Sequence, residues 1–232
     1  MGGFANNAPI VTDGLIFYVD AGNDNSYPGS GNTWTDLIGG NANLSSNYPT
    51  YNSSNGGYFS YDGTNDSHDW SANQTYTGTL TVSMWAKWPS TSSEYTSMFS
   101  TGIDGLSANE PGSLQFGRAA GSVNTAFFVT VAGTTNITEN VTISSSYLNK
   151  WTNWVVVAKS GNYKVYADGN LLLNSTSGND PTFSSTYKFK IAENRNDSVW
   201  AEMDAACAMI HTKELSSTEI TQNYNALKNR FV

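Results

Sequence analysis

Charged residues are scarce in this sequence, and basic residues most of all. Only 13% of the 232 residues are charged, and 11 Lys and Arg stand against 19 Asp and Glu, which gives a formal net charge of −8. Nucleic-acid binding needs clustered Lys and Arg to neutralise phosphate groups. The composition therefore excludes nucleic acid as a partner and favours uncharged ones.

Cysteine and long apolar runs are also nearly absent. Cys207 is the only cysteine, so no intramolecular disulfide can form, and we expect its thiol to act as a small buried apolar group. No apolar run approaches the roughly 20 residues of a membrane-spanning helix, which argues against membrane insertion. The opening MGGFANNAPIVTDG has neither the basic nor the apolar region of a signal peptide, so we expect no classical export signal.

The sequence is instead rich in residues that form strands and turns. Aromatic residues make up 13% of the chain, and 21 glycines accompany abundant Asn, Ser and Thr. This mixture is typical of short strands joined by polar turns. Because all-β sandwiches of this length commonly have a single core, we predict one all-β domain over residues 13–232, preceded by a flexible arm over residues 1–12.

Individual segments carry strand, turn and helix signals. Residues 14–22, GLIFYVDAG, are typical of a buried strand, and residues 80–88, LTVSMWAKW, alternate as a half-buried strand does. Residues 153–173, NWVVVAKSGNYKVYADGNLLL, predict strands joined at SGN and at an Asp-Gly turn. Ser216 and Glu219 form a capping-box pattern, which predicts one short C-terminal helix.

Two carboxylates stand out in residues 198–210, SVWAEMDAACAMI. Glu202 and Asp204 are two residues apart, and on a strand this spacing places both on one face. The alternate residues are apolar, and we expect them to face the core; they are Val199, Ala201, Met203, Ala205, Cys207 and Met209. The pair itself is consistent with half of a glycosidase active site or with two surface residues.

Four segments in order resemble the concanavalin A-like lectin/glucanase superfamily, specifically its laminin-G-like domains. They are YFSYDGTNDS (58–67), LTVSMWAKW (80–88), KWTNWVVVAKSGNYKVYADGNLL (150–172) and MIHTKELSSTEITQNYNAL (209–227). The resemblance implies an all-β, two-sheet antiparallel jelly-roll sandwich. The opening GLIFYVDAGNDNSYPGSGNTWTDL (14–37) resembles the variant of this domain encoded among structural genes of tailed bacteriophages.

This resemblance implies a non-catalytic virion surface or decoration protein, assembled in the host cytoplasm. Its lectin-like sandwich would contact host cell-surface glycans or neighbouring capsid or tail subunits, and self-association into a homo-oligomer stays open. A free-standing carbohydrate-binding lectin and a laminarinase-like glycoside hydrolase are the alternatives. The missing export signal agrees better with a virion protein than with a secreted lectin.

The hydrolase alternative depends on a third carboxylate. Laminarinase-type members carry Glu-x-Asp-x-Glu on the catalytic strand, or a bulged version with one more residue before the last Glu. Glu202 and Asp204 match the first two places, but Ala206 and Cys207 occupy the positions available to the last. Since retaining hydrolysis needs a nucleophile and a separate proton donor, we expect no enzymatic activity.

Exposed aromatic residues and acidic residues supply the remaining candidate sites. Trp70, Trp85 and Tyr95 are candidates for stacking on a sugar, with Glu202 to bond its hydroxyls. Each aromatic is equally consistent with a core residue or a loop anchor.

A structural calcium between the terminal strands is implied by the resemblance. Asp20, at the end of the first strand, and Asp204, on the last, are its candidate ligands, because calcium prefers carboxylate and carbonyl oxygens. An Asp that starts a turn and an exposed Asp on a strand are the alternative interpretation.

Overall fold

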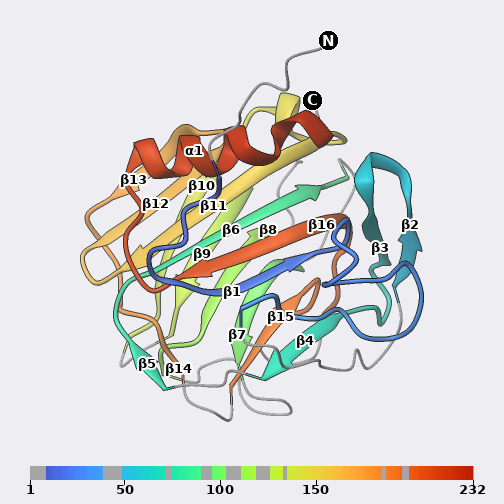
Figure 1. The fold of residues 1–232 in the computed structure, drawn as a ribbon. Coiled ribbons are helices and arrows are strands. Elements are labelled where there is room, and N and C mark those ends of the chain that lie inside the picture. Colours follow the sequence, from blue (N-terminus) through green and yellow to red (C-terminus); the bar gives the residue numbers. More distant parts are fainter. Residues whose placement is uncertain are drawn as a thin grey trace.

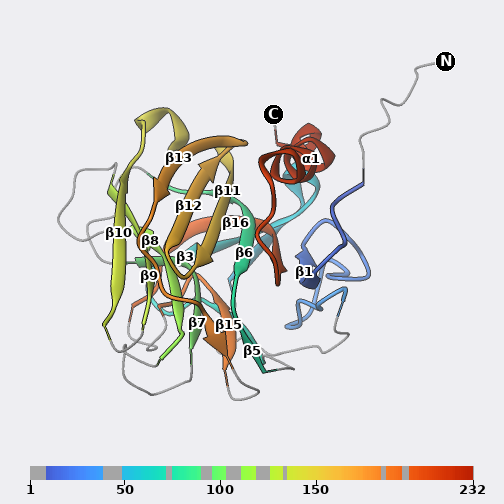
Figure 2. The same cartoon turned by 90° about the vertical axis from the view of Figure 1, so that its left-hand side faces the viewer.

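The computed structural model describes residues 9–38, 49–71, 75–89, 96–102, 111–118, 126–132, 135–183, 187–194 and 199–231. Within these residues the chain forms two large antiparallel sheets and one helix near the C-terminus (Figure 1). Figure 2 shows the sheets packed against each other, with the helix on the side of the larger sheet that faces away from the smaller one. This arrangement confirms the predicted jelly-roll sandwich.

The larger sheet contains eight strands. Its order is β13 (Asn170–Ser175), β12 (Asn162–Ala167), β11 (Trp151–Lys159), β6 (Leu80–Lys87), β16 (Glu202–His211), β3 (Tyr58–Asp62) and β2 (Thr50–Asn52), and β1 (Leu15–Asp20) pairs with β16. All of these pairings are antiparallel.

The smaller sheet contains six strands. Its order is β10 (Ile137–Thr142), β9 (Ala126–Val131), β8 (Leu114–Arg118), β7 (Thr96–Gly102), β15 (Lys188–Ile191) and β4 (His68–Ser71). A separate two-stranded ribbon joins β5 (Tyr76–Thr77) to β14 (Thr182–Phe183), and 3₁₀ turns occur at η1 (Ser54–Gly56), η2 (Ser145–Tyr147) and η3 (Lys228–Arg230).

Turn chemistry explains the β11–β12–β13 meander. The predicted Asp-Gly turn lies between β12 and β13, where Asp168 has φ 50° and Gly169 has φ 78°. Tight hairpin turns need positive φ at their central residues, which Asp and Gly tolerate best. The Asp168 carboxylate also accepts a hydrogen bond from the backbone N–H of Asn153 at 2.8 Å, which ties the turn to β11.

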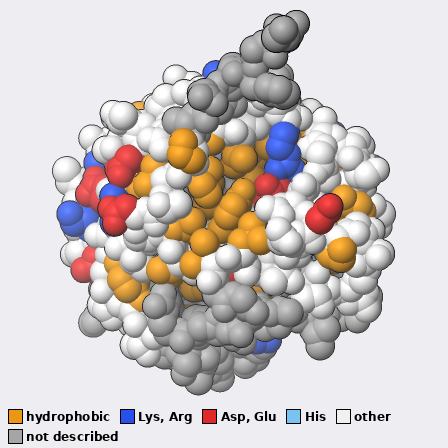
Figure 3. Space-filling view, viewed as in Figure 1, with side chains coloured by type: hydrophobic (Ala, Val, Ile, Leu, Met, Phe, Trp, Pro, Cys, Tyr) orange, Lys and Arg blue, Asp and Glu red, His pale blue; other side chains and the backbone are white. Residues whose placement is uncertain are grey.

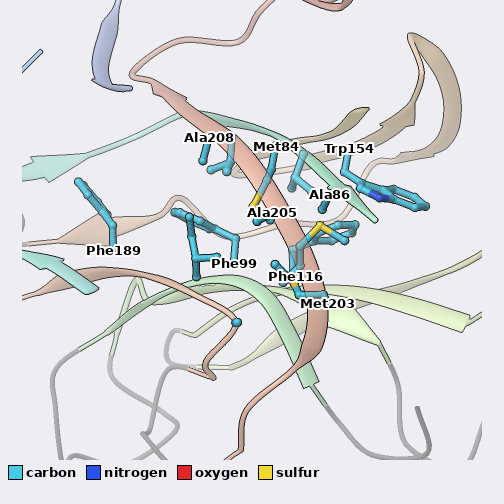
Figure 4. Packing of buried hydrophobic residues seen from close by; sticks show 14 of the residues in the cluster. Met84, Ala86, Phe99, Phe116, Trp154, Phe189, Met203, Ala205 and Ala208 are labelled. Atoms are coloured by element: carbon cyan, nitrogen blue, oxygen red, sulfur yellow. The ribbon is translucent and has the colours of Figure 1, made fainter. Parts of the chain in front are cut away.

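The hydrophobic core fills the space between the two sheets. Met84 and Ala86 of β6 lie in one cluster with Phe99 and Phe116 of the smaller sheet (Figure 4), and the Trp154 ring of β11 lies 6.3 Å from the Phe116 ring. The inward residues of β6 are those that the alternation predicts.

A β-bulge in β16 changes which residues face that core. The pairing of β16 with β6 shifts between Ala205 and Cys207, so the extra residue Ala206 is inserted there. As a result Ala205 and Ala208 both lie in the core between the sheets (Figure 4), whereas Cys207 packs with Trp85 on the outer face. The prediction that Cys207 and Met209 face the core is therefore wrong, because one inserted residue reverses the alternation that follows it.

The outer face of the larger sheet is covered in part by α1 (Ser217–Leu227). The predicted capping box is present: the Ser216 side chain accepts from the Glu219 N–H at 3.3 Å, and the Glu219 carboxylate accepts from the Ser216 N–H at 2.8 Å. No helix in the described part of the chain has the length and apolarity to cross a membrane.

Residues 9–12, the described part of the predicted arm, also pack on this face. The backbone N–H of Val11 donates to Asn223 Oδ1 of α1 at 2.7 Å, and its carbonyl lies 2.9 Å from His211 Nε2 of β16. Gln222 donates to the carbonyl of Pro9 at 2.6 Å. The packed domain therefore begins before residue 13, and residues 1–8 lie outside the described residues.

Candidate functional site

A polar pocket opens on the outer face of the larger sheet, at the start of β16. Its volume is about 320 Å³. The lining residues are Ser60, Tyr61, Lys87, Pro89, Asn149, Glu202, Met203 and Asp204. Strand register brings the central ones together, because Asp204 of β16 pairs with Lys87 of β6 on one side and with Ser60 of β3 on the other.

The two carboxylates in the pocket have different surroundings. Asp204 accepts a hydrogen bond from the Ser60 hydroxyl at 2.6 Å, and its other oxygen lies 3.7 Å from Lys87 Nζ. Glu202 is exposed, and it pairs across the sheet with Asp62 of β3, which is also acidic. The pocket thus offers two hydrogen-bond acceptors, the oriented carboxylate of Asp204 and the exposed carboxylate of Glu202. The Lys87 ammonium supplies a donor beside them.

The third carboxylate of the glycosidase pattern is replaced by a buried thiol. The bulge at Ala206 turns Cys207 to the same face as Glu202 and Asp204, which is the position that the bulged sequence pattern gives to its last Glu. Burial raises the pKa of the Cys207 thiol, and only 1% of the residue is exposed. A covered, protonated thiol at this position cannot replace an acid/base that must reach a glycosidic oxygen.

Asp20 is held by an arginine rather than arranged as a calcium ligand. Arg230 Nη1 donates to both carboxylate oxygens of Asp20, at 2.7 and 2.9 Å, and the Tyr18 hydroxyl and the Gly22 N–H also donate to it. Calcium needs about six to eight oxygen ligands. Within the described residues no three His, Cys, Asp or Glu side chains gather to hold a metal ion, and Arg230 takes up the Asp20 carboxylate. The calcium site between Asp20 and Asp204 stays a prediction.

Two of the three predicted sugar-stacking aromatics, Trp70 and Trp85, are buried. Trp70 is 2% exposed between the sheets, where its indole N–H donates to the Trp34 carbonyl at 2.6 Å. Trp85 lies on the outer face, as the alternation predicts, but it is 0% exposed because the C-terminal segment covers it. The prediction that these two rings are exposed is wrong, and Tyr95 lies outside the described residues.

Sequence reasoning missed three polar residues of the pocket. Ser60 and Lys87 lie opposite Asp204 only because of the register of β3 and β6, which no local pattern specifies. Asn149 precedes β11 with φ 57°, a conformation that Asn tolerates better than most residues. Of the predicted site residues, the structure brings together Glu202 and Asp204.

Several solved structures share this fold at low sequence identity. Domain 4 of AbnA, an extracellular arabinanase from Geobacillus stearothermophilus solved with arabinotriose, superimposes with a TM-score of 0.66 at 13% identity, over 90% of this chain and 98% of that one. The binding domain of botulinum neurotoxin serotype G gives a TM-score of 0.66 at 15% identity, over 90% of this chain and 50% of the other.

An enzyme is also among the similar structures. Trypanosoma rangeli sialidase, in complex with the inhibitor DANA, gives a TM-score of 0.66 at 14% identity, over 98% of this chain and 35% of the sialidase. The chain therefore spans about half of the toxin domain and about a third of the sialidase. The fold occurs in both binding domains and hydrolases.

Sequence comparison gives a more specific result. No curated protein matches the chain significantly. Residues 62–221, which include the β16 strand and the start of α1, match the family profile described as Concanavalin A-like lectin/glucanases superfamily. This match covers more than half of the sequence and agrees with the observed sandwich, so the chain belongs to the concanavalin A-like lectin/glucanase superfamily.

Proposed function

We propose that this domain is a non-catalytic glycan-binding module of a virion surface or decoration protein, and that it binds a neutral saccharide in the pocket at the start of β16. The observation that carries the proposal is the pocket itself, with Glu202, Asp204 and Lys87 side by side on one face of the larger sheet.

The pocket chemistry suits sugar hydroxyls. A hydroxyl can donate to the carboxylate of Glu202 or Asp204 and accept from the Lys87 ammonium, and adjacent hydroxyls of one sugar can do both at once. Asp204 is already oriented by Ser60 and Lys87, so little side-chain freedom is lost on binding. Pro89, which is partly exposed, adds apolar surface for the C–H faces of the ring.

The charge around the pocket favours a neutral saccharide over an acidic one. Glu202 and Asp204 line it, Asp62 lies opposite Glu202, and Lys87 is the one basic residue among the described residues of the lining. A sialic acid or uronic acid would bring another carboxylate against these like charges, which disfavours its binding.

The covered Cys207 supports the non-catalytic part of the proposal. An acid/base would have to stand there to complete the glycosidase set, and Trp85 and the C-terminal segment close that position to a substrate. We therefore expect binding without hydrolysis.

A glycan array carrying neutral and sialylated glycans tests the binding site. We expect the wild-type protein to retain neutral glycans, and the double variant Glu202→Gln/Asp204→Asn to lose at least tenfold in affinity because both charged acceptors are gone. Glu139→Gln is the matched control, since Glu139 lies on β10 of the other sheet. Equal binding by the pocket variant and the control would contradict the site, and release of reducing sugar by wild-type protein would contradict the absence of catalysis.

The virion role rests on the resemblance of residues 14–37 to phage structural proteins, and capsid or tail subunits are the proposed neighbours. We expect the native protein to cosediment with assembled particles. Recovery of all the protein as a free soluble species would instead favour a free-standing lectin.

A further inference from the structure

A cluster of aromatic side chains continues the outer face beyond the pocket. Trp85 precedes Lys87 by two residues on β6, so its side chain emerges about 7 Å further along the same face. Trp151 of β11 pairs directly with Lys87, and Asn153 of β11 pairs with Trp85. The aromatic cluster therefore lies directly beside Lys87, which lines the proposed saccharide pocket.

Phe231 covers this cluster together with Tyr224 of α1, whose ring stacks on Trp85 at 5.5 Å. The Phe231 ring stacks on Trp85 with centroids 4.5 Å apart and planes 23° apart, and it lies 5.1 Å from the Trp151 ring. Tyr58 of β3 meets Trp151 edge-on at 5.2 Å. Figure 3 shows hydrophobic side chains gathered near the middle of this face. The Phe231 ring therefore occupies a place against two aromatic rings, where the apolar C–H face of a sugar ring could pack instead.

Polar groups of Trp85 and of its cross-strand partner Asn153 have no hydrogen-bond partner among the described residues. The indole N–H of Trp85 and both side-chain polar atoms of Asn153 lack a hydrogen bond within the described structure, although both residues are 0% exposed. Buried polar groups in folded proteins are nearly always hydrogen-bonded, because leaving them unpaired is costly. Phe231 has no polar atom in its side chain to offer them, whereas a sugar ring carries several hydroxyls.

Arg230 and Phe231 hold the covering segment on the sheet. Arg230 pairs with Asp20 and donates to the Gly57 carbonyl at 3.2 Å. Gly22 leaves room for the Arg230 guanidinium, since a Cβ added at this position would lie 2.5 Å from Arg230 Nη2. Residues 228–231 are otherwise half-buried or exposed, so displacing them requires breaking the Arg230 contacts and the ring contacts of Phe231 with Trp85 and Trp151.

We propose that Trp85, Trp151 and Asn153 form a second saccharide subsite, which Phe231 occupies in the closed state. This inference rests on the proposed function and extends it, because it makes the ligand a neutral oligosaccharide. One sugar unit of this oligosaccharide enters the pocket. When residues 228–231 move away from the sheet, the next sugar unit takes the place of the Phe231 ring and forms hydrogen bonds with Asn153 and the Trp85 N–H.

The test compares wild-type protein with Phe231→Ala on an array that carries neutral gluco-, galacto-, manno- and arabino-oligosaccharides of one to six residues. We expect Phe231→Ala to bind chains of two or more residues about tenfold more tightly, since the competing ring stack is lost, and to bind monosaccharides unchanged. Adding Asn153→Ala to this variant should remove the gain. Phe231→Leu keeps the apolar volume without the ring, and serves if the alanine variant fails to fold.

The outcomes separate the two proposals. Wild-type binding that Glu202→Gln/Asp204→Asn abolishes, with the same chain-length profile in Phe231→Ala and Phe231→Leu, would overturn the second subsite alone. Binding to no saccharide by wild type or by either Phe231 variant would overturn both. Oligosaccharide binding that appears only when the Phe231 ring is removed would support both.

Discussion

Replacing Arg230 with alanine would test how strongly the C-terminal segment is attached to the sheet. The change removes the guanidinium that contacts both carboxylate oxygens of Asp20 and leaves that carboxylate with a side chain only 8% exposed. Breaking a buried ion pair by removing one partner costs about 3–5 kcal/mol. Arg230 is 23% exposed, and the Tyr18 hydroxyl and Gly22 N–H still donate to Asp20. We therefore expect a loss of about 2–3 kcal/mol in the free energy of unfolding, below the fully buried case.

Urea denaturation measures this loss. With an m-value of about 2.5 kcal/mol per M, the midpoint of Arg230→Ala should fall by about 1 M. The double variant Asp20→Asn/Arg230→Ala should recover part of the stability, because the uncompensated charge is removed.

Asp13→Ala provides the comparison for an exposed pair. Asp13 lies 2.7 Å from Lys213, the same distance as the closer Asp20–Arg230 contact, but its side chain is 82% exposed. Solvent screening limits such a pair to about 0–1 kcal/mol. If Arg230→Ala cost no more than Asp13→Ala, the burial argument would be refuted, and the segment would have to be held by ring stacking alone.

Two further predictions concern buried titratable groups. Burial lowers the pKa of His68 to about 3 from an ordinary value of 6.5, so the neutral ring stabilises the fold above pH 6.5 and this contribution is lost as pH falls toward 3. In melting experiments across that range, His68→Gln should lose less stability on acidification than wild type, and parallel curves would count against a buried neutral histidine. The Cys207 thiol, 1% exposed and with its pKa raised by burial, should react with a thiol reagent only as fast as the protein opens. Stoichiometric labelling of native protein within seconds would contradict the covered position assigned to it.

Local patterns predicted the elements of this fold well, because their causes are local. The alternation of residues 80–88 predicts β6, the Asp168-Gly169 pair predicts the turn before β13, and Ser216 with Glu219 predicts the start of α1. Each depends on residues within a few positions of one another, where propensity and backbone hydrogen bonding decide. The helix ends at Leu227, and Phe231 lies beyond its end and packs on Trp85.

The candidate site was predictable only in part. Glu202 and Asp204 share a face, as a two-residue spacing on a strand requires, and their pocket gathers them with Lys87 and Ser60. The bulge at Ala206 had no local signature, and it decided that Cys207 follows the carboxylates onto the outer face. Trp85 shows the same limit, since its place on the polar face of β6 was predictable but its burial was not.

The sequence by itself determined the all-β class, the turns, the capped helix and the pairing of two carboxylates on one face, since these follow from neighbouring residues. Only the tertiary structure decided what covers that face. The contact of Asp20 with Arg230 joins residues 210 positions apart, and it brings Phe231 onto Trp85. Such contacts depend on strand register and on how the chain ends pack, and the periodicity of side chains along one strand specifies neither.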